Sequence, residues 1–101
     1  MPLDEKELTT ALRMLDDAGF ALEIDLGRGR HSARRSVVDP TSGNEVVVRV
    51  LLDTENYALA VWDELPEGPS PRVDARGSWR DTRPVPLAQR AVRTAAEVEN
   101  G

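Results

Sequence analysis

The stretch 27–36 of the chain, GRGRHSARRS, holds four arginines and the only histidine of the protein. Arginine presents a planar fork of N–H donors that matches the oxygens of a phosphate or a carboxylate, so this stretch could bind an anionic partner. The segment has neither the strand, GxGxxG turn and helix of a dinucleotide site nor the GK[ST] of a phosphate loop. Four residues are therefore candidates for partner binding: Arg28, Arg30, Arg34 and Arg35. A solvated hairpin loop, whose arginines pair with acidic segments of the same chain, is the alternative.

A second basic segment surrounds Trp79. Its flanking arginines are Arg76, Arg80 and Arg83. Tryptophan beside arginine is the composition of an interaction hot spot, so we expect an exposed Trp79 to anchor a partner together with these three arginines. The alternative is that Trp79 folds back over the sheet, because aromatic side chains are seldom left bare. We expect Trp62, which lies in a strand-like run with two alanines, to belong to the core.

The chain offers no recognisable set of catalytic residues or metal ligands. It has no cysteine, which excludes disulfides, thiolate nucleophiles and zinc–sulfur sites. His31 stands alone, as an exposed loop histidine, whereas a first-row metal needs three or four clustered ligands. The serines lie in no GxSxG or SxxK setting, and the acidic residues do not follow the calcium-loop pattern. We therefore expect no cofactor, no metal and no enzymatic activity.

Charge is segregated along the chain. Residues 1–25 carry seven acids against two bases, and residues 51–71 carry five acids and no base, whereas 26–50 and 72–93 are arginine-rich. Such patches serve partner selection and steering, unless they neutralise one another. The formal net charge of −5 opposes binding to a polyanion. We therefore expect a small protein-binding module, such as an adaptor, a chaperone-like binder or an inhibitor. The alternative is a nucleic-acid-binding domain that uses the arginines of 28–35 and 72–93.

Length and composition indicate a single soluble domain. A chain of 101 residues is long enough for one modest core, so we expect one globular domain over 1–101. No segment approaches the roughly 18 apolar residues that span a bilayer, and the N-terminal sequence MPLDEKEL is unlike a secretory signal. We expect a cytoplasmic protein that does not contact a membrane. The sequence leaves its oligomeric state open.

Apolar residues at helical spacing predict a helix at each end of the chain. The first should run from about residue 5 to residue 18, with Asp4 as its cap and Gly19 at its end. Its apolar stripe consists of Leu8, Ala11, Leu12, Leu15 and Ala18. The second helix should open at Pro86 and stop at Asn100–Gly101. Its buried face would carry Leu87, Ala91, Ala95 and Val98.

Four strands are predicted between the helices, over residues 20–26, 33–38, 45–52 and 57–65. Their short connections favour antiparallel pairing. The almost uninterrupted apolar run of 46–52 indicates either a central strand or a strand covered on both faces. The Pro/Gly/Arg-rich segment 66–85 predicts a long surface loop, with a short edge strand over 72–79 as the alternative. The predicted fold class is α+β in the order α-β-β-β-β-α, an antiparallel meander sheet with the two terminal helices packed on it.

This order of elements resembles the layout of double-stranded RNA-binding domains, and RAVRTAA (residues 90–96) is similar to the basic, alanine-rich second helix of that family. The family's lysine cluster at the start of that helix is replaced here by Pro84–Val85–Pro86. The layout and acidity also resemble small acidic secretion chaperones and cytosolic adaptors. The first resemblance covers topology and one helix only, and the second covers layout and acidity without a shared motif, so neither assigns the chain to a family.

Overall fold

The computed structural model describes residues 3–25 and 29–101. Five strands lie between two helices, and they form one antiparallel sheet in the order β1-β2-β3-β4-β5. The elements are α1 (Glu5–Asp17), β1 (Ala21–Asp25), β2 (Arg30–Val38), β3 (Glu45–Leu52), β4 (Asn56–Leu65), β5 (Gly68–Ser78) and α2 (Pro84–Glu99). The α+β class, the meander and the two terminal helices are confirmed. The order differs from the prediction by one additional strand.

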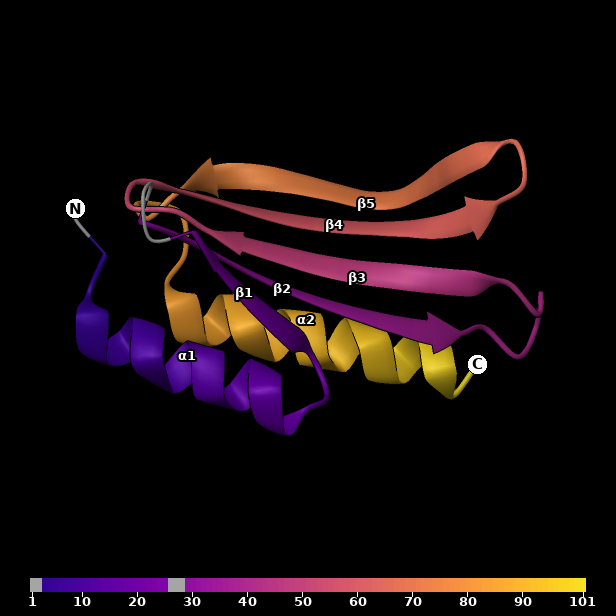
Figure 1. The fold of residues 1–101 in the computed structure, drawn as a ribbon, viewed down its shortest axis with the longest axis horizontal. Helices are drawn as coiled ribbons and strands as arrows, with labels where there is room; N and C mark the ends of the chain where they lie inside the picture. The colour runs from indigo at the N-terminus through magenta and orange to yellow at the C-terminus, as the bar shows by residue number, and fades with distance from the viewer. Residues whose placement is uncertain (1–2, 26–28) are drawn as a thin grey trace.

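Both helices lie against the same face of the sheet (Figure 1). In α1 the side chain of Asp4 accepts hydrogen bonds from the backbone N–H groups of Lys6 and Glu7, at 2.9 and 3.3 Å, as expected of a helix cap. Ala11 and Leu15 of the predicted stripe are fully buried. In α2 the buried residues are Pro84, Leu87, Ala88, Ala91 and Ala95, so the predicted face is confirmed although the helix begins two residues earlier than expected.

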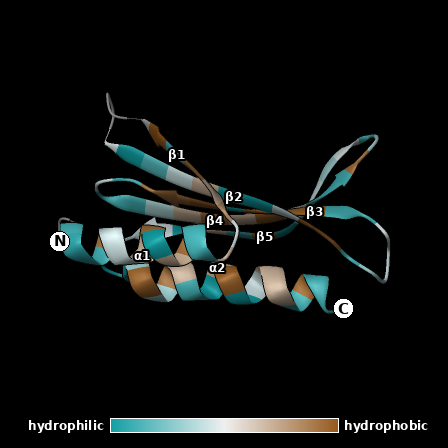
Figure 2. Cartoon of the chain, turned by 60° about the horizontal axis from the view of Figure 1, so that its bottom comes forward, coloured by the Kyte–Doolittle hydropathy of each residue, from teal (hydrophilic) through white to brown (hydrophobic). Residues whose placement is uncertain are grey.

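The core fills the space between this face and the helices (Figure 2). β3 is the central strand, which explains its apolar run: Val46, Val48 and Val50 point toward the helices and are fully buried. Val47 faces the other way and is also fully buried, beneath neighbouring side chains of the sheet. Small residues on α2 allow the helix to lie close to β2 and β3.

The prediction of a loop over 66–85 is wrong for most of its length, because Gly68–Ser78 forms β5, the longest strand. Two prolines, Pro69 and Pro71, are tolerated because β5 lies at the edge of the sheet and needs backbone hydrogen bonds on one side only. The pairing shifts between Val61 and Trp62 of β4, where Arg72 is the extra residue of a bulge in β5. The alternative of a short edge strand over 72–79 was nearer to the structure.

Candidate functional site

The face of the sheet that points away from the helices is covered by no other element of the described chain, and we call it the open face (Figures 1 and 2). Strand pairing orders its side chains into rows. Moving across the strands from β1 to β5, one row is Ala21, Arg34, Arg49, Ala60 and Asp74, and the next is Glu23, Ser32, Leu51, Ala58 and Arg76. The open face therefore gathers residues from all five strands.

Three of the arginines predicted to bind a partner instead connect parts of the fold. Arg30 pairs with Asp53 (3.4 Å) across the end of the sheet, and Arg35 pairs with Glu99 of α2 (3.1 Å). Arg83 reaches the Glu7 carboxylate at 2.7 Å, and the same carboxylate accepts the backbone N–H of Val85. Glu7 thus joins the start of α2 to α1. These contacts match the alternative prediction, in which arginines neutralise acidic segments of the same chain.

The remaining predicted residues do not form one cluster. Arg28 lies outside the described residues, and Arg80 is exposed in the turn between β5 and α2. The strand predicted over 33–38 begins three residues earlier, at Arg30, so the alternative of a hairpin loop over 27–36 is wrong from residue 30 onward. His31, expected in an exposed loop, is half-buried in β2. Side chains alternate between the faces of a strand, so Arg34 and Arg35 point to opposite sides of the sheet. Of the described members of the predicted set, Arg30, Arg34 and Arg76 lie on the open face, where Arg30 is paired with Asp53.

The burial of the two tryptophans is the reverse of the prediction. Trp79 is only 8% exposed; it belongs to the core cluster, and its Nε1–H donates to the backbone oxygen of Asp53 at 2.8 Å. Trp62 is half-buried on the open face. Leu59 and Val61 take the helix-facing positions of β4, so Trp62 and its neighbouring alanines share the face that has no helix. The predictions of an exposed Trp79 and a core Trp62 are therefore both wrong.

Arg49 was not singled out from the sequence, yet it stands directly opposite Arg34 in the β2–β3 register. Like charges directly opposite one another on a sheet are destabilising. The Arg34 guanidinium carbon also lies 5.9 Å from the centre of the Trp62 ring, within the range of a cation–π contact. The pair therefore places two cations side by side near an accessible aromatic ring.

A second pair of like charges lies at the other end of the open face. Glu45 of β3 is directly opposite Glu64 of β4, and both side chains are exposed. The Glu64 carboxylate accepts the Trp62 Nε1–H at 2.6 Å, which fixes the indole between the two pairs. The open face therefore has a cationic pair near its centre, an anionic pair toward one end and an aromatic ring between them.

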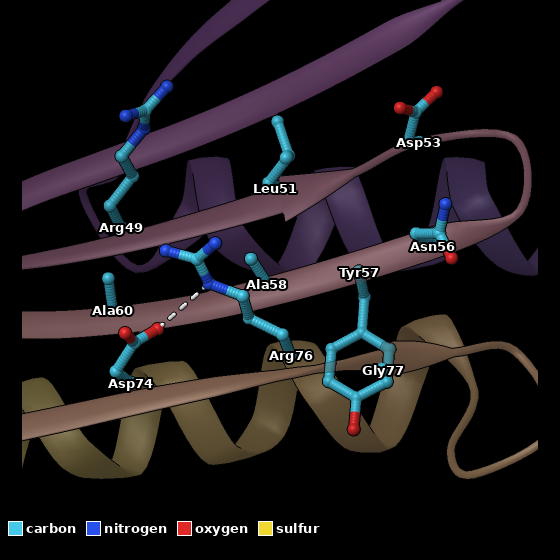
Figure 3. Close-up of a pocket in the computed structure, with 10 residues that line it drawn as sticks. All are labelled: Arg49, Leu51, Asp53, Asn56, Tyr57, Ala58, Ala60, Asp74, Arg76 and Gly77. Atoms are coloured by element: carbon cyan, nitrogen blue, oxygen red, sulfur yellow. Dashed lines mark hydrogen bonds and ion pairs between the residues drawn. The ribbon is translucent and has the colours of Figure 1, made fainter.

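A hollow of about 600 Å³ lies on the open face beside Arg49 (Figure 3). The strand register places it on the opposite side of the arginine pair from Trp62. Its lining residues are Arg49, Leu51, Asp53, Asn56, Tyr57, Ala58, Ala60, Asp74, Arg76 and Gly77. Ala58 and Ala60 are short, so the surface is depressed where the flanking strands carry long side chains. Arg76 pairs with Asp74 at 3.1 Å, and both side chains are largely exposed. The hollow combines an apolar floor with guanidinium groups at its rim, which suits an apolar group that carries a carboxylate.

Arg72 forms the most extended ion-pair cluster of the described chain, on the helix-facing side of the sheet beyond the helices. It binds Asp63 of β4 and, at 2.8 Å, Asp39 at the end of the β2–β3 hairpin. The Arg72 hydrogen bonds hold the pKa values of both carboxyl groups below their usual range, aided by N–H donors from Thr41 and Asn44. The pKa of Arg72 is raised by the same bonds. This cluster connects β4 and β5 to the hairpin and is structural.

The described residues contain no group of three or more His, Asp or Glu side chains placed to hold a metal ion. None of the described helices is long and apolar enough to cross a membrane. Comparisons with protein-family models, with curated proteins and with solved structures give no match to this chain. Functional inference therefore depends on the geometry of the open face.

Proposed function

We propose that this chain is a protein-binding module that docks on its partner through the open face. Two pairs of like-charged side chains support this most strongly. Arg34 lies opposite Arg49, and Glu45 lies opposite Glu64, on the one face that no described element covers. Each pair costs stability in the free protein. A partner with acidic groups facing the arginines and basic groups facing the glutamates would offset that cost. Local rules of stability are most often broken at functional sites.

The mixture of charges favours a protein partner over a nucleic acid. A phosphate backbone presents one sign of charge throughout, and Glu45, Glu64 and Asp74 on the same face would repel it. A protein surface can present both signs, and the half-buried Trp62 supplies the aromatic anchor typical of protein interfaces. Adaptors, chaperone-like binders and inhibitors would all use such a face. In this proposal Arg34 and Arg76 are kept from the site expected from the sequence, and Arg49 and Trp62 are added to them.

The test compares two double charge reversals that change the net charge equally. Arg34→Glu with Arg49→Glu alters the open face, whereas Arg90→Glu with Arg93→Glu alters exposed positions of α2 on the other side of the molecule. Each protein is immobilised and exposed to nuclease-treated extract of the native host, and the captured protein is then purified for affinity measurements. We expect the open-face variant to lose roughly 100-fold or more in affinity, because like charges would meet across the interface. The α2 variant should bind like the wild type.

Two results would contradict the proposal. Equal binding by both variants would show that the open face is not the docking surface. Capture that disappears after nuclease treatment, together with a nucleic-acid affinity that falls steeply with salt and is weakened by the open-face reversals, would favour the nucleic-acid alternative. Both variants should first be shown to unfold at similar urea concentrations, so that a loss of binding reports the surface and not the fold.

A further inference from the structure

The sheet has two edges, β1 and β5, and the chain protects them unequally. β5 carries Pro69 and Pro71, which have no N–H to offer a neighbouring strand, and it is paired to β4 through a bulge. Prolines and bulges are devices by which natural sheets prevent another strand from joining an edge. β1 has neither device in its sequence ALEID.

Two large apolar residues of β1 are exposed, Leu22 (38%) and Ile24 (53%). They lie opposite Ala33 and His31 of β2, on the helix-facing side of the sheet. This side of the sheet thus offers apolar side chains next to strand backbone that is paired on one side only. An occupant that satisfies both must itself be an extended strand.

A second copy of this chain is poorly suited to this edge. In an antiparallel pair centred on the middle of β1, Glu23 would lie opposite Glu23 of the other copy. A shift that brings Leu22 opposite Leu22 would instead place Glu23 opposite Ala21, so in neither register does a cation lie opposite Glu23. Carboxylates directly opposite one another are destabilising, and each copy carries a net charge of −5. Basic residues on the incoming strand would remove this repulsion.

We propose that the free edge of β1 binds an extended segment of a partner protein in which apolar and basic residues alternate. The segment would add a sixth strand to the sheet. Its apolar side chains would share a face with Leu22 and Ile24, and its basic side chains would share the face of Glu23. Glu23 also belongs to an open-face row, but binding through the backbone edge of β1 does not require that Arg34 and Arg49 bind another protein, so the inference does not depend on the function proposed above.

A short peptide of alternating valine and lysine is the probe, and backbone amide NMR of the full chain is the measurement. Two N-methylated forms of the peptide distinguish strand pairing from charge attraction. One form is methylated at the backbone nitrogens of all odd-numbered residues, and the other at those of all even-numbered residues. Only one of these forms lacks the N–H donors that face β1, so we expect that form to bind more than about tenfold weaker than the other. Peptide-induced shifts should centre on residues 21–25.

Matched variants complete the test. Ile24→Lys places a cation on the β1 edge and should abolish binding, whereas Ser70→Lys makes the same kind of change on β5 and should leave binding unaltered. Ile24 is already half exposed, so its replacement should not unfold the protein. The inference is overturned if both N-methylated forms bind equally, if shifts map to other strands, if Ile24→Lys binds as well as the wild type, or if the protein alone self-associates through residues 21–25.

Discussion

Truncating Trp79 to alanine should strongly destabilise the domain. The indole is only 8% exposed, its ring centre lies 5.6 Å from that of Tyr57, and its Nε1–H donates to the Asp53 backbone oxygen at 2.8 Å. Loss of a buried aromatic side chain typically costs about 3–5 kcal/mol. Domains of this size have total stabilities of roughly 5–15 kcal/mol, so Trp79→Ala should lose a large share of the folding free energy.

A graded series separates packing from hydrogen bonding at this position. Trp79→Phe keeps most of the apolar area but removes the N–H donor, and it should cost about 1 kcal/mol more than the loss of area alone because the Asp53 carbonyl loses its partner. Trp62→Ala is the matched control, since Trp62 is half-buried on the open face and should cost clearly less than Trp79→Ala. Urea titrations with a common m-value give these differences in unfolding free energy.

Fluorescence gives an independent reading of the same assignment. In a Trp62→Phe background, emission from Trp79 should be blue-shifted and resistant to soluble quenchers, because the ring is buried. The reasoning is refuted if Trp79→Ala costs less than Trp62→Ala, or if Trp79 emission is red-shifted and easily quenched. Either result would return Trp79 to the exposed position expected from its arginine-rich neighbourhood.

Two further substitutions test the structural contacts. Arg72 lowers the pKa values of Asp39 and Asp63 below the usual 3.8. The contribution of these ion pairs to the free energy of unfolding should therefore be fully present above pH 3.8 and disappear as the pH falls through the lowered pKa values. The gap in unfolding free energy between wild type and Arg72→Met should therefore narrow in acid, and a gap that is constant with pH would disprove the linkage. Gly77→Ala should destabilise by about 1–3 kcal/mol in urea titrations, because the added Cβ would lie 2.6 Å from Asp81 Oδ2 and 2.8 Å from the Tyr57 hydroxyl. Combining it with Asp81→Ala should recover part of the loss, and strict additivity would argue against the clash.

Local sequence patterns were sufficient to predict most of the helices and strands. The helical spacing around Leu15 and Leu87 and the alternation along four strands depend on neighbours close in sequence, so both helices and four strands could be predicted. β5 was missed because its prolines and glycines resemble a loop. At a sheet edge the cost of a missing N–H is small, and whether a segment lies at an edge is decided by the rest of the chain.

The sequence showed that the candidate site would contain arginine and tryptophan, but it did not show which arginines and which tryptophan. A strand's alternation shows that Trp62 and Leu59 face opposite sides, yet it does not show which side the helices cover. Arg49 stood out only when the register placed it beside Arg34, which is distant in the sequence. The run of arginines looked like one cluster, but the sheet divides Arg34 from Arg35 and uses Arg35 to hold α2.

The amino-acid sequence by itself therefore determined both helices, four of the five strands, their antiparallel meander and the segregation of charge, because each depends on short-range periodicity or composition. The tertiary structure alone decided which face stays open, which arginines are neutralised within the fold, and which tryptophan is buried. These outcomes depend on pairing between distant segments, since the register of five strands and the placement of both helices on one face assign each side chain its neighbours.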